Sequence, residues 1–327
     1  MKTRVVSTAS PQDRESAVAE AVEHLRRGEV VALPTETVYG LAADALDIDA
    51  VLKIFEAKER PMFDPLIVHL PDREWIERLA EPTTDEALSA RLIEAFWPGP
   101  LTIVLPRRSA VPDVVAAGLA TVAVRMSAHP VFSEILRSFG RPVAAPSANR
   151  FGRISPTTAE HVYSELKDWI PLILDGGPTT HGLESTIVAV RSGGIEVLRP
   201  GPITYEQLSQ FAKVTTAPAS ARPHAPGQMR SHYAPRTALF LTDDLRSFQP
   251  PAGKRIGALS WRGTTGAFFA ELRVLSHSGD LREAATNLFR CLRELDDAQL
   301  DLIVAEQVPE SGLGAAIMDR LRRAAGR

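Results

Sequence analysis

The chain has 327 residues, of which 44% are hydrophobic and 24% charged, and its formal net charge is −3. These values fit a folded globular chain long enough for two domains, and the net acidity argues against a protein that mainly grips nucleic-acid backbone. No apolar run is long enough to span a membrane and no apolar signal segment follows the N-terminus, so we expect a cytoplasmic protein without a membrane partner.

The first elements in chain order alternate between helix and strand. Ser10 can cap a helix that Gly28 ends, and the apolar segment EVVALP then predicts a buried strand that runs into the polar turn TETVYG. A second helix is expected between a cap at Asp47 and a stop at Pro61. The strand PLIVHL follows and ends in His69. Functional groups are common where a strand ends in such a loop.

The elements up to residue 212 continue in irregular alternation. A helix is expected at TTDEALSARLIEAFW, strands at LTIVLP, TVAVRM and PVAAP, and a helix at HPVFSEILRSFG. Further strands are expected at PLILDGG, STIVAV and IEVLRPG, with helices over 158–166 and 205–212. Short turns between several strands suit antiparallel pairing, so we predict an α+β domain with a mixed sheet over residues 1–212.

A proline-rich segment without periodicity, residues 213–236, predicts a linker. It also contains Met229, Arg230, His232 and Tyr233, which an inert spacer would not need. We therefore interpret this segment as a possible active-site lid that brings His232 and Tyr233 near a ligand, with a solvated tether as the alternative. The remaining residues, 237–327, alternate between strand and helix in the manner of a small α/β, Rossmann-like domain.

Common catalytic and nucleotide-binding motifs such as GxxxxGK[ST], GxGxxG, HExxH and CxxC do not occur. The single cysteine, Cys291, lies in a helical pattern and cannot form an internal disulfide. Cations instead gather near predicted element ends, among them Lys58, Arg60, Arg125 and Arg199. Each alone could be a solvated surface charge, but together they suit phosphate or carboxylate groups. This pattern favours positioning and charge stabilisation over a covalent nucleophile.

The segment PSANRFGRISPTT, residues 146–158, is too rich in proline, glycine and short polar side chains to pack as a helix or strand. Proline and glycine can hold an irregular backbone close to a ligand. We therefore interpret this segment as a binding loop.

Seven motifs taken together closely resemble the YrdC family in its threonylcarbamoyl-AMP synthase branch. Between residues 33 and 204 they occur in this order: LPTETVYGLAADA, KIFEAKERPMFDPLIVHL, FWPGPLTIVL, VAVRM, APSANRFGRISPTT, DGGPTTHGLESTIV and LRPGPIT. The remainder, with APGQMRSHYAP and a terminal GLGAAIMDRL, resembles the longer two-domain form of that family. The resemblance implies a twisted mixed sheet around a concave site.

The resemblance also implies a reaction. L-threonine, bicarbonate or CO2, and ATP would give threonylcarbamoyl-adenylate and pyrophosphate, with Mg2+ expected on the phosphates and no metal site built by the protein. Downstream proteins would transfer the threonylcarbamoyl group to the adenine beside the anticodon of tRNA. Stable tRNA binding by this chain is not expected, in keeping with its net acidity.

The site residues follow from the motifs of this resemblance. Lys58 and Arg60 would be catalytic and would also bind ATP. The other residues implied for ATP are Asp64, Ser147, Asn149, Ser155, Arg199, His232 and Tyr233. Those implied for threonine are Thr35, His69, Thr121, Arg125, Ala145 and Ser185.

Two positions depart from the pattern of the family. Asp64 stands where many relatives have asparagine, which leaves its contact with ATP open, and Ser127 stands where proline is usual. Two other functions stay open at this point: a non-catalytic RNA-binding module of the same fold, and a relative of the carbamoyltransferase of hydrogenase maturation.

Overall fold

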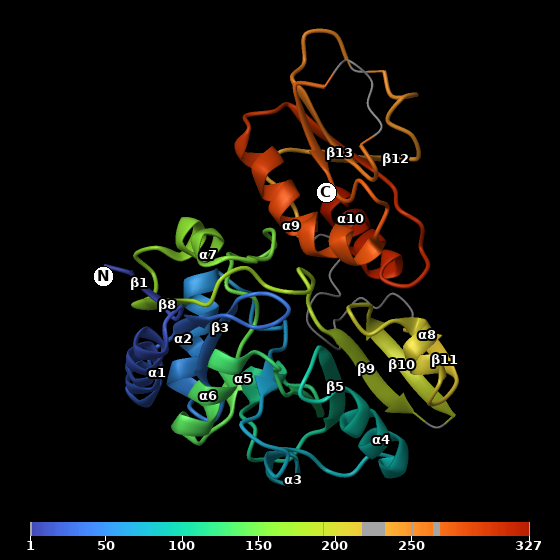
Figure 1. Ribbon diagram of the computed structural model, residues 1–327. Coiled ribbons are helices and arrows are strands. Elements are labelled where there is room, and N and C mark those ends of the chain that lie inside the picture. The colour runs from blue at the N-terminus through green and yellow to red at the C-terminus, as the bar shows by residue number, and fades with distance from the viewer. Residues whose placement is uncertain (1, 192, 218–232, 250, 264–268, 327) are drawn as a thin grey trace.

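The computed structural model describes residues 2–191, 193–217, 233–249, 251–263 and 269–326 (Figure 1). The described residues form two sheets. One has eleven strands in the order β1-β8-β2-β3-β7-β4-β6-β5-β9-β10-β11, and the other has four in the order β12-β15-β13-β14. The predicted combination of a mixed-sheet domain and a small α/β domain is confirmed.

The strands of the large sheet are short and are separated by helices of varied length. The strands are β1 Arg4–Ser7, β2 Val31–Leu33, β3 Gly40–Asp44, β4 Ile67–His69, β5 Leu101–Pro106, β6 Thr121–Arg125, β7 Val143–Ala144, β8 Leu172–Asp175, β9 Thr186–Arg191, β10 Gly194–Arg199 and β11 Val214–Thr216. The helices are α1 Pro11–Arg26, α2 Ile48–Lys58, α3 Trp75–Leu79, α4 Glu86–Phe96, α5 Asp113–Ala116, α6 Pro130–Phe139, α7 Ala159–Leu166 and α8 Tyr205–Ser209.

The predicted helix caps are present. The Ser10 side chain accepts a hydrogen bond from the N–H of Asp13, and the Asp47 side chain accepts from the N–H groups of Asp49 and Ala50. Each cap satisfies backbone donors that the first turn of a helix leaves free. The two helices therefore begin where the sequence predicts.

The two faces of the large sheet bury different side chains, as the period-two geometry of strands requires. Val31 and Leu33 of β2 pack against α1 and α6, whereas Ala32 between them belongs to the cluster that contains α2 and α7. Helices thus cover both faces of this part of the sheet (Figure 1).

Strand pairing brings several polar strand ends together. His69 at the end of β4 is in register with Arg125 of β6 on one side and with Val143 of β7 on the other. β5 pairs with β9 in parallel, and β9 pairs with β10, which ends at Arg199. The ends of β4, β6 and β10 and the segments that follow β2 and β7 contribute to the site described below.

The second sheet is entirely parallel, with strands β12 Leu239–Thr242, β13 Ile256–Ser260, β14 Glu271–Val274 and β15 Leu302–Glu306. Its helices, α9 Leu281–Asp297 and α10 Gly314–Ala325, face the first domain (Figure 1). One hydrophobic cluster joins the two domains, because Val38, Ile154 and Leu183 pack with residues such as Phe289 and Ile317.

Two observations concern the segment predicted as a linker, 213–236. Its start, Val214–Thr216, is the strand β11, which pairs in parallel with β10 at the edge of the large sheet. Residues 218–232, which include much of the predicted lid and His232, lie outside the described residues. In the described part of the chain, no helix has the length and apolar character needed to cross a bilayer.

Candidate active site

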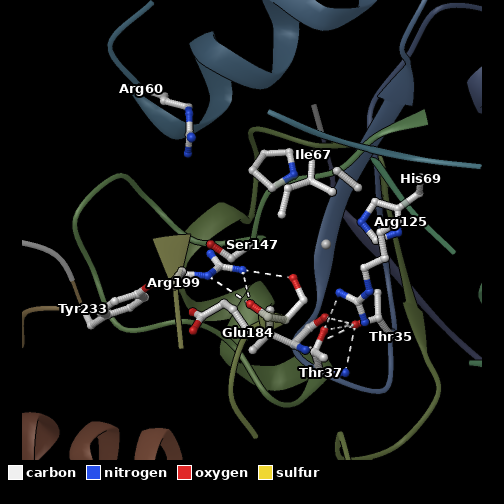
Figure 2. Close-up of a pocket in the computed structure, with 15 residues that line it drawn as sticks. Thr35, Thr37, Arg60, Ile67, His69, Arg125, Ser147, Glu184, Arg199 and Tyr233 are labelled. Carbon is white, nitrogen blue, oxygen red and sulfur yellow. Dashed lines mark hydrogen bonds between the residues drawn. The ribbon is translucent and has the colours of Figure 1, made fainter. Parts of the chain in front are cut away.

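A pocket lies where strand ends and loops of the first domain meet (Figure 2). It encloses a cavity of about 40 Å³. Many of the residues that the sequence singled out line it: Thr35, Arg60, His69, Arg125, Ala145, Ser147, Ser185, Arg199 and Tyr233. Figure 2 shows Arg125, His69 and Thr35 on one side of the pocket and Arg60, Arg199 and Tyr233 on the other.

Arg125, on the first side, is buried and held by three partners. Its Nη2 donates to Glu36 Oε1 at 2.6 Å, its Nη1 donates to Thr37 Oγ1 at 3.0 Å, and its Nε donates to the Gly99 carbonyl at 3.1 Å. These bonds fix the guanidinium group at the pocket wall. A fixed guanidinium fork suits a carboxylate ligand.

The Glu36 carboxylate, which the sequence analysis did not select, balances the charge of Arg125. Burial alone would raise its pKa, but the charge of Arg125 and the hydrogen bond from Ser127 lower the pKa of Glu36 to about 2. The Ser127 hydroxyl donates to Glu36 Oε2. The departure from proline at position 127 thus supplies a hydrogen bond to this ion pair.

Thr35 shapes the turn after β2 with its own side chain. Its Oγ1 accepts hydrogen bonds from the N–H groups of Thr37 and Val38 and lies 2.6 Å from the carbonyl of Val38, to which it donates. Such side-chain bonds to nearby backbone are typical of turns. Thr35 therefore organises this wall as well as lining it.

His69 lies beside Arg125 as a neutral ring. Burial, followed by the charge of Arg125, lowers the pKa of His69 to about 3. Its ring packs against Phe132 at 4.9 Å between centroids, and its Nδ1 has no hydrogen-bond partner within the described part of the chain. A neutral imidazole at this place can donate or accept one hydrogen bond.

On the second side, Arg199 is tied to the segment before β9. Its Nη2 donates to the carbonyl of Ser185 at 2.9 Å and to Ser185 Oγ at 3.1 Å. Ser185 Oγ also lies 2.8 Å from Thr102 Oγ1. Arg199 and Ser185 therefore occupy fixed positions relative to each other.

Arg60 forms a buried ion pair with Asp64. The two side chains approach to 2.8 Å, with exposures of 4% and 0%, and burial raises the pKa of Asp64. Arg60 also donates to the carbonyl of Pro65 at 2.8 Å. Asp64 itself does not line the pocket, so in this structure it acts on the pocket through Arg60.

Three predicted residues hold the binding loop 146–158 instead of lining the pocket. The Lys58 ammonium nitrogen donates to the carbonyls of Ser147 and Asn149, and Asn149 Nδ2 donates to the carbonyls of Arg150 and Arg153. The Ser155 hydroxyl donates to Glu184 Oε1. Burial, followed by the charge of Arg60, lowers the pKa of Lys58 to about 7.

Tyr233 connects the pocket to the second domain. It is buried, its ring stacks on Phe289 at 5.6 Å, and the guanidinium carbon of Arg320 lies 5.1 Å from its centroid. Thr121, in contrast, is the first residue of β6 and lies at the opposite end of that strand from Arg125. Thr121 does not line the pocket.

Sequence reasoning missed the acidic and distant members of the site, Glu36, Glu184 and Arg320. Glu36 and Glu184 stand within the motifs LPTETVYG and GLESTIV, but acidic side chains are not expected beside phosphate groups. Arg320 lies 136 positions from its partner Glu184. Only the sequence GLGAAIMDRL at the start of α10 could have drawn attention to it.

The described residues contain no group of three or more His, Cys, Asp or Glu side chains placed to hold a metal ion. The carboxylates nearest the pocket already have cationic partners: Glu36 with Arg125, Asp64 with Arg60, and Glu184 with Arg320. A divalent cation would therefore find no ready protein cage in the described part of the site.

Comparisons with known proteins cover nearly the whole chain. A family model described as "Telomere recombination" matches residues 23–201, and one described as "Threonylcarbamoyl-AMP synthase, C-terminal domain" matches residues 203–326. The threonylcarbamoyl-AMP synthase of Bacillus subtilis (strain 168) is 40% identical, over 99% of this chain and 96% of that protein.

A curated protein and a solved structure from Pyrococcus abyssi give a similar result. The threonylcarbamoyl-AMP synthase of Pyrococcus abyssi (strain GE5 / Orsay) is 40% identical, over 94% of this chain and 93% of that protein. The crystal structure of P. abyssi Sua5 complexed with L-threonine has a TM-score of 0.88 at 37% identity, and it covers 99% of this chain and 98% of that chain.

Proposed function

The chain belongs to the threonylcarbamoyl-AMP synthase family, and from that premise we propose that it is an enzyme that makes threonylcarbamoyl-adenylate from L-threonine, bicarbonate or CO2, and ATP. Pyrophosphate is the second product. The observation that carries this proposal is a pocket with buried guanidinium groups on two sides, Arg125 on one and Arg60 with Arg199 on the other. Two anionic substrates can be held there in one orientation.

Threonine occupies the side of Arg125 in this proposal. Arg125 would bind its carboxylate, while Thr35, His69, Ser185 and the backbone near Ala145 would surround the rest of the molecule. The complex of P. abyssi Sua5 with L-threonine supports this choice of ligand. Thr121 stays a predicted threonine residue from the resemblance, although it lies outside the pocket lining.

ATP occupies the side of Arg60 and Arg199. These two guanidinium groups and the loop residue Ser147 would contact phosphate oxygens, with Tyr233 beside them. Lys58, Asn149 and Ser155 would support this contact by holding the loop 146–158. Asp64 would hold Arg60 in place through their ion pair, at the cost of offsetting part of its charge. His232 stays a predicted ATP residue that lies outside the described part of the chain.

The reaction needs alignment more than a protein nucleophile. The threonine amine and CO2 form a carbamate, an oxygen of which forms a bond to the α-phosphorus of ATP as the bond from that phosphorus to pyrophosphate breaks. Both reacting groups are anionic, so fixed cations lower the barrier by holding them together and stabilising the charge on the departing pyrophosphate. We expect Mg2+ to enter as part of the nucleotide substrate, because no protein cage for it is found among the described residues.

The product is a mixed anhydride, which is suited to transfer rather than storage. We propose that separate downstream proteins transfer its threonylcarbamoyl group to tRNA, and that this chain does not bind tRNA stably, given its net charge of −3. The relatives that match almost the whole chain carry the name of the synthase. This favours synthesis over the RNA-binding module and over the carbamoyltransferase considered from the sequence.

The test is pyrophosphate release with ATP and bicarbonate, measured separately with each of the twenty amino acids. We expect release that depends on threonine and is much slower with the others. Salt-dependent retention of RNA without threonine-dependent release of pyrophosphate would instead support the RNA-binding module.

A further inference from the structure

We propose that Arg320, in the second domain, is a positioning residue of the active site, and that it neutralises Glu184 and fixes the segments that carry Ser185 and Arg199. The proposal rests on the proposed function, because it concerns how that same pocket is prepared for ATP. It assigns the second domain a direct part in the catalytic site.

The geometry is a contact between α10 and two segments of the first domain. Arg320 Nε donates to Glu184 Oε2 at 3.0 Å, and Arg320 Nη1 donates to the carbonyl of Pro200 at 2.8 Å. Glu184 directly precedes Ser185, and Pro200 directly follows Arg199. One side chain therefore holds both neighbours of the Ser185–Arg199 pair.

The contact is buried. The side chain of Arg320 is 0% exposed and that of Glu184 is 7% exposed. The ring of Tyr233, which also lines the pocket, lies over the guanidinium group of Arg320. Little water reaches the pair, so its charges are weakly screened and its geometry is well defined.

The charge of Glu184 explains why this position needs a cation. Glu184 lines the pocket beside Arg199, the group proposed to bind phosphate. An uncompensated carboxylate there would repel ATP and would also attract Arg199 away from its place. Arg320 supplies this positive charge from the second domain by bonding to Glu184 Oε2. Ser155 donates to the other carboxylate oxygen of Glu184.

The alternative is that Arg320 merely joins the two domains. The interface contains another ion pair, the partly buried Arg293 with Glu165 at 2.8 Å, and neither of these residues lines the pocket. Arg320 differs from Arg293 because its partner, Glu184, lines the pocket. A positioning role therefore predicts an effect on ATP that a joining role does not.

The experiment compares Arg320→Met, Arg320→Lys, Glu184→Gln and the double variant Arg320→Met/Glu184→Gln in the full chain. We expect Arg320→Met to lower kcat/KM for ATP on the order of 100-fold, with a much smaller change in KM for threonine. The double variant should recover most of this loss, because the unpaired carboxylate of Glu184 is gone and Asp319, the other carboxylate beside Arg320, still pairs with Arg323. Arg320→Lys should lie between Arg320→Met and the unaltered enzyme.

Arg322→Met is the matched control. It removes a cation from the same helix, but the partner of Arg322 is Glu310 in the same domain. We expect its kinetics to be unchanged. Circular dichroism and thermal melting of every variant separate a loss of activity from a loss of folding, and the charge-neutral double variant covers the case in which Arg320→Met does not fold.

The outcomes are distinguishable. A folded Arg320→Met with unchanged kinetics, or a folded double variant as impaired as Arg320→Met, would overturn the proposal and leave Arg320 as an interdomain contact. Absence of threonine-dependent pyrophosphate release in the unaltered enzyme would instead refute the proposed function. In that event, calorimetric titration with ATP alone still tests the inference, since Arg320→Met should weaken binding and the double variant restore it.

Discussion

At the scale of single residues, the cations of the pocket are set against buried carboxylates. Arg125 pairs with Glu36 and Arg60 pairs with Asp64, in each case with little exposure of either side chain. Removing one partner of a buried pair typically costs about 3 to 5 kcal/mol, because the other charge is left uncompensated. Arg60→Ala is therefore expected to lower stability as well as phosphate binding. A substitution of Asp64 also costs stability, but it keeps the Arg60 cation in the pocket.

Asp64→Asn should strengthen ATP binding. The substitution keeps the size of the side chain but removes the charge that offsets Arg60, so more of the field of Arg60 reaches the phosphates. We expect a gain on the order of 1 kcal/mol, or roughly three- to tenfold in Kd by calorimetry with an unreactive ATP analogue. Asp113→Asn, at an exposed pair with Arg107, is the control and should leave Kd unchanged. Weaker binding by Asp64→Asn would show that the carboxylate mainly orients Arg60.

Glu36 should make stability depend on pH in the acid range. Its pKa in the folded protein is about 2, below the ordinary value of 4.5, so the unfolded chain binds the proton more readily. The stabilisation is complete above pH 4.5 and is lost as the pH falls toward 2. This lowering of the pKa of Glu36 corresponds to a stabilisation of about 3 kcal/mol.

The measurement is urea unfolding of the native chain and of Glu36→Gln at several pH values between 3 and 6. Glu36→Gln should be less stable at pH 6, because Arg125 loses its charged partner. The difference in free energy of unfolding between the two proteins should shrink as the pH falls. A difference that is constant with pH would contradict the assigned pair.

At the scale of elements, the loop 146–158 is held by polar side chains in addition to the packing of Ala148 and Ile154. Asn149 is 1% exposed and bonds to two carbonyls of the loop, and Lys58 bonds to two more. The composition that made this segment unsuitable for a helix is thus used to satisfy its backbone. These few hydrogen bonds contribute to the shape of the loop.

Asn149→Ala should therefore loosen the loop before it affects the rest of the domain. Loss of the two bonds is expected to cost about 1 to 3 kcal/mol locally. Amide hydrogen exchange at residues 147–155 should become faster, and ATP affinity should fall. Asn287→Ala, which removes a bond from Asn287 to the carbonyl of Leu275 in the second domain, is the matched control. Unchanged exchange in the loop of Asn149→Ala would show that the backbone alone maintains its shape.

At the scale of the whole molecule, the two domains share a hydrophobic cluster and two ion pairs, one buried and one partly buried. This contact predicts that they unfold together in a single calorimetric transition. Leu183→Ala, which removes a first-domain side chain from the shared cluster, should lower stability by about 2 to 5 kcal/mol and should separate the transition into two. Two transitions in the unaltered chain would mean that the domains are energetically independent.

The sequence was sufficient for features that depend on local patterns. Helix caps at Ser10 and Asp47, the mixed sheet and the small α/β second domain follow from periodicity and turn residues, and the structure has them. The strand Val214–Thr216 was not expected, because three residues carry too little periodicity to be recognised.

The candidate site was only partly predictable. Motifs indicated residues such as Arg60, Arg125 and Arg199, which meet in one pocket. They did not indicate that Lys58 and Asn149 turn toward carbonyls of the loop, because residue type does not determine the partner of a hydrogen bond. The pairing of Glu184 with Arg320 spans 136 positions, a separation at which no pattern in a single sequence specifies a contact.

The 136 positions between Glu184 and Arg320 also affect how the chain folds during synthesis on the ribosome. At about 5 to 20 residues per second, Arg320 is added roughly 7 to 27 seconds after Glu184. During that interval the first domain can form its sheet, but the Glu184 carboxylate at its pocket lacks its cationic partner Arg320. We expect the nascent first domain to keep this region open to proteases and chaperones, and to mature as a catalyst only after α10 has docked.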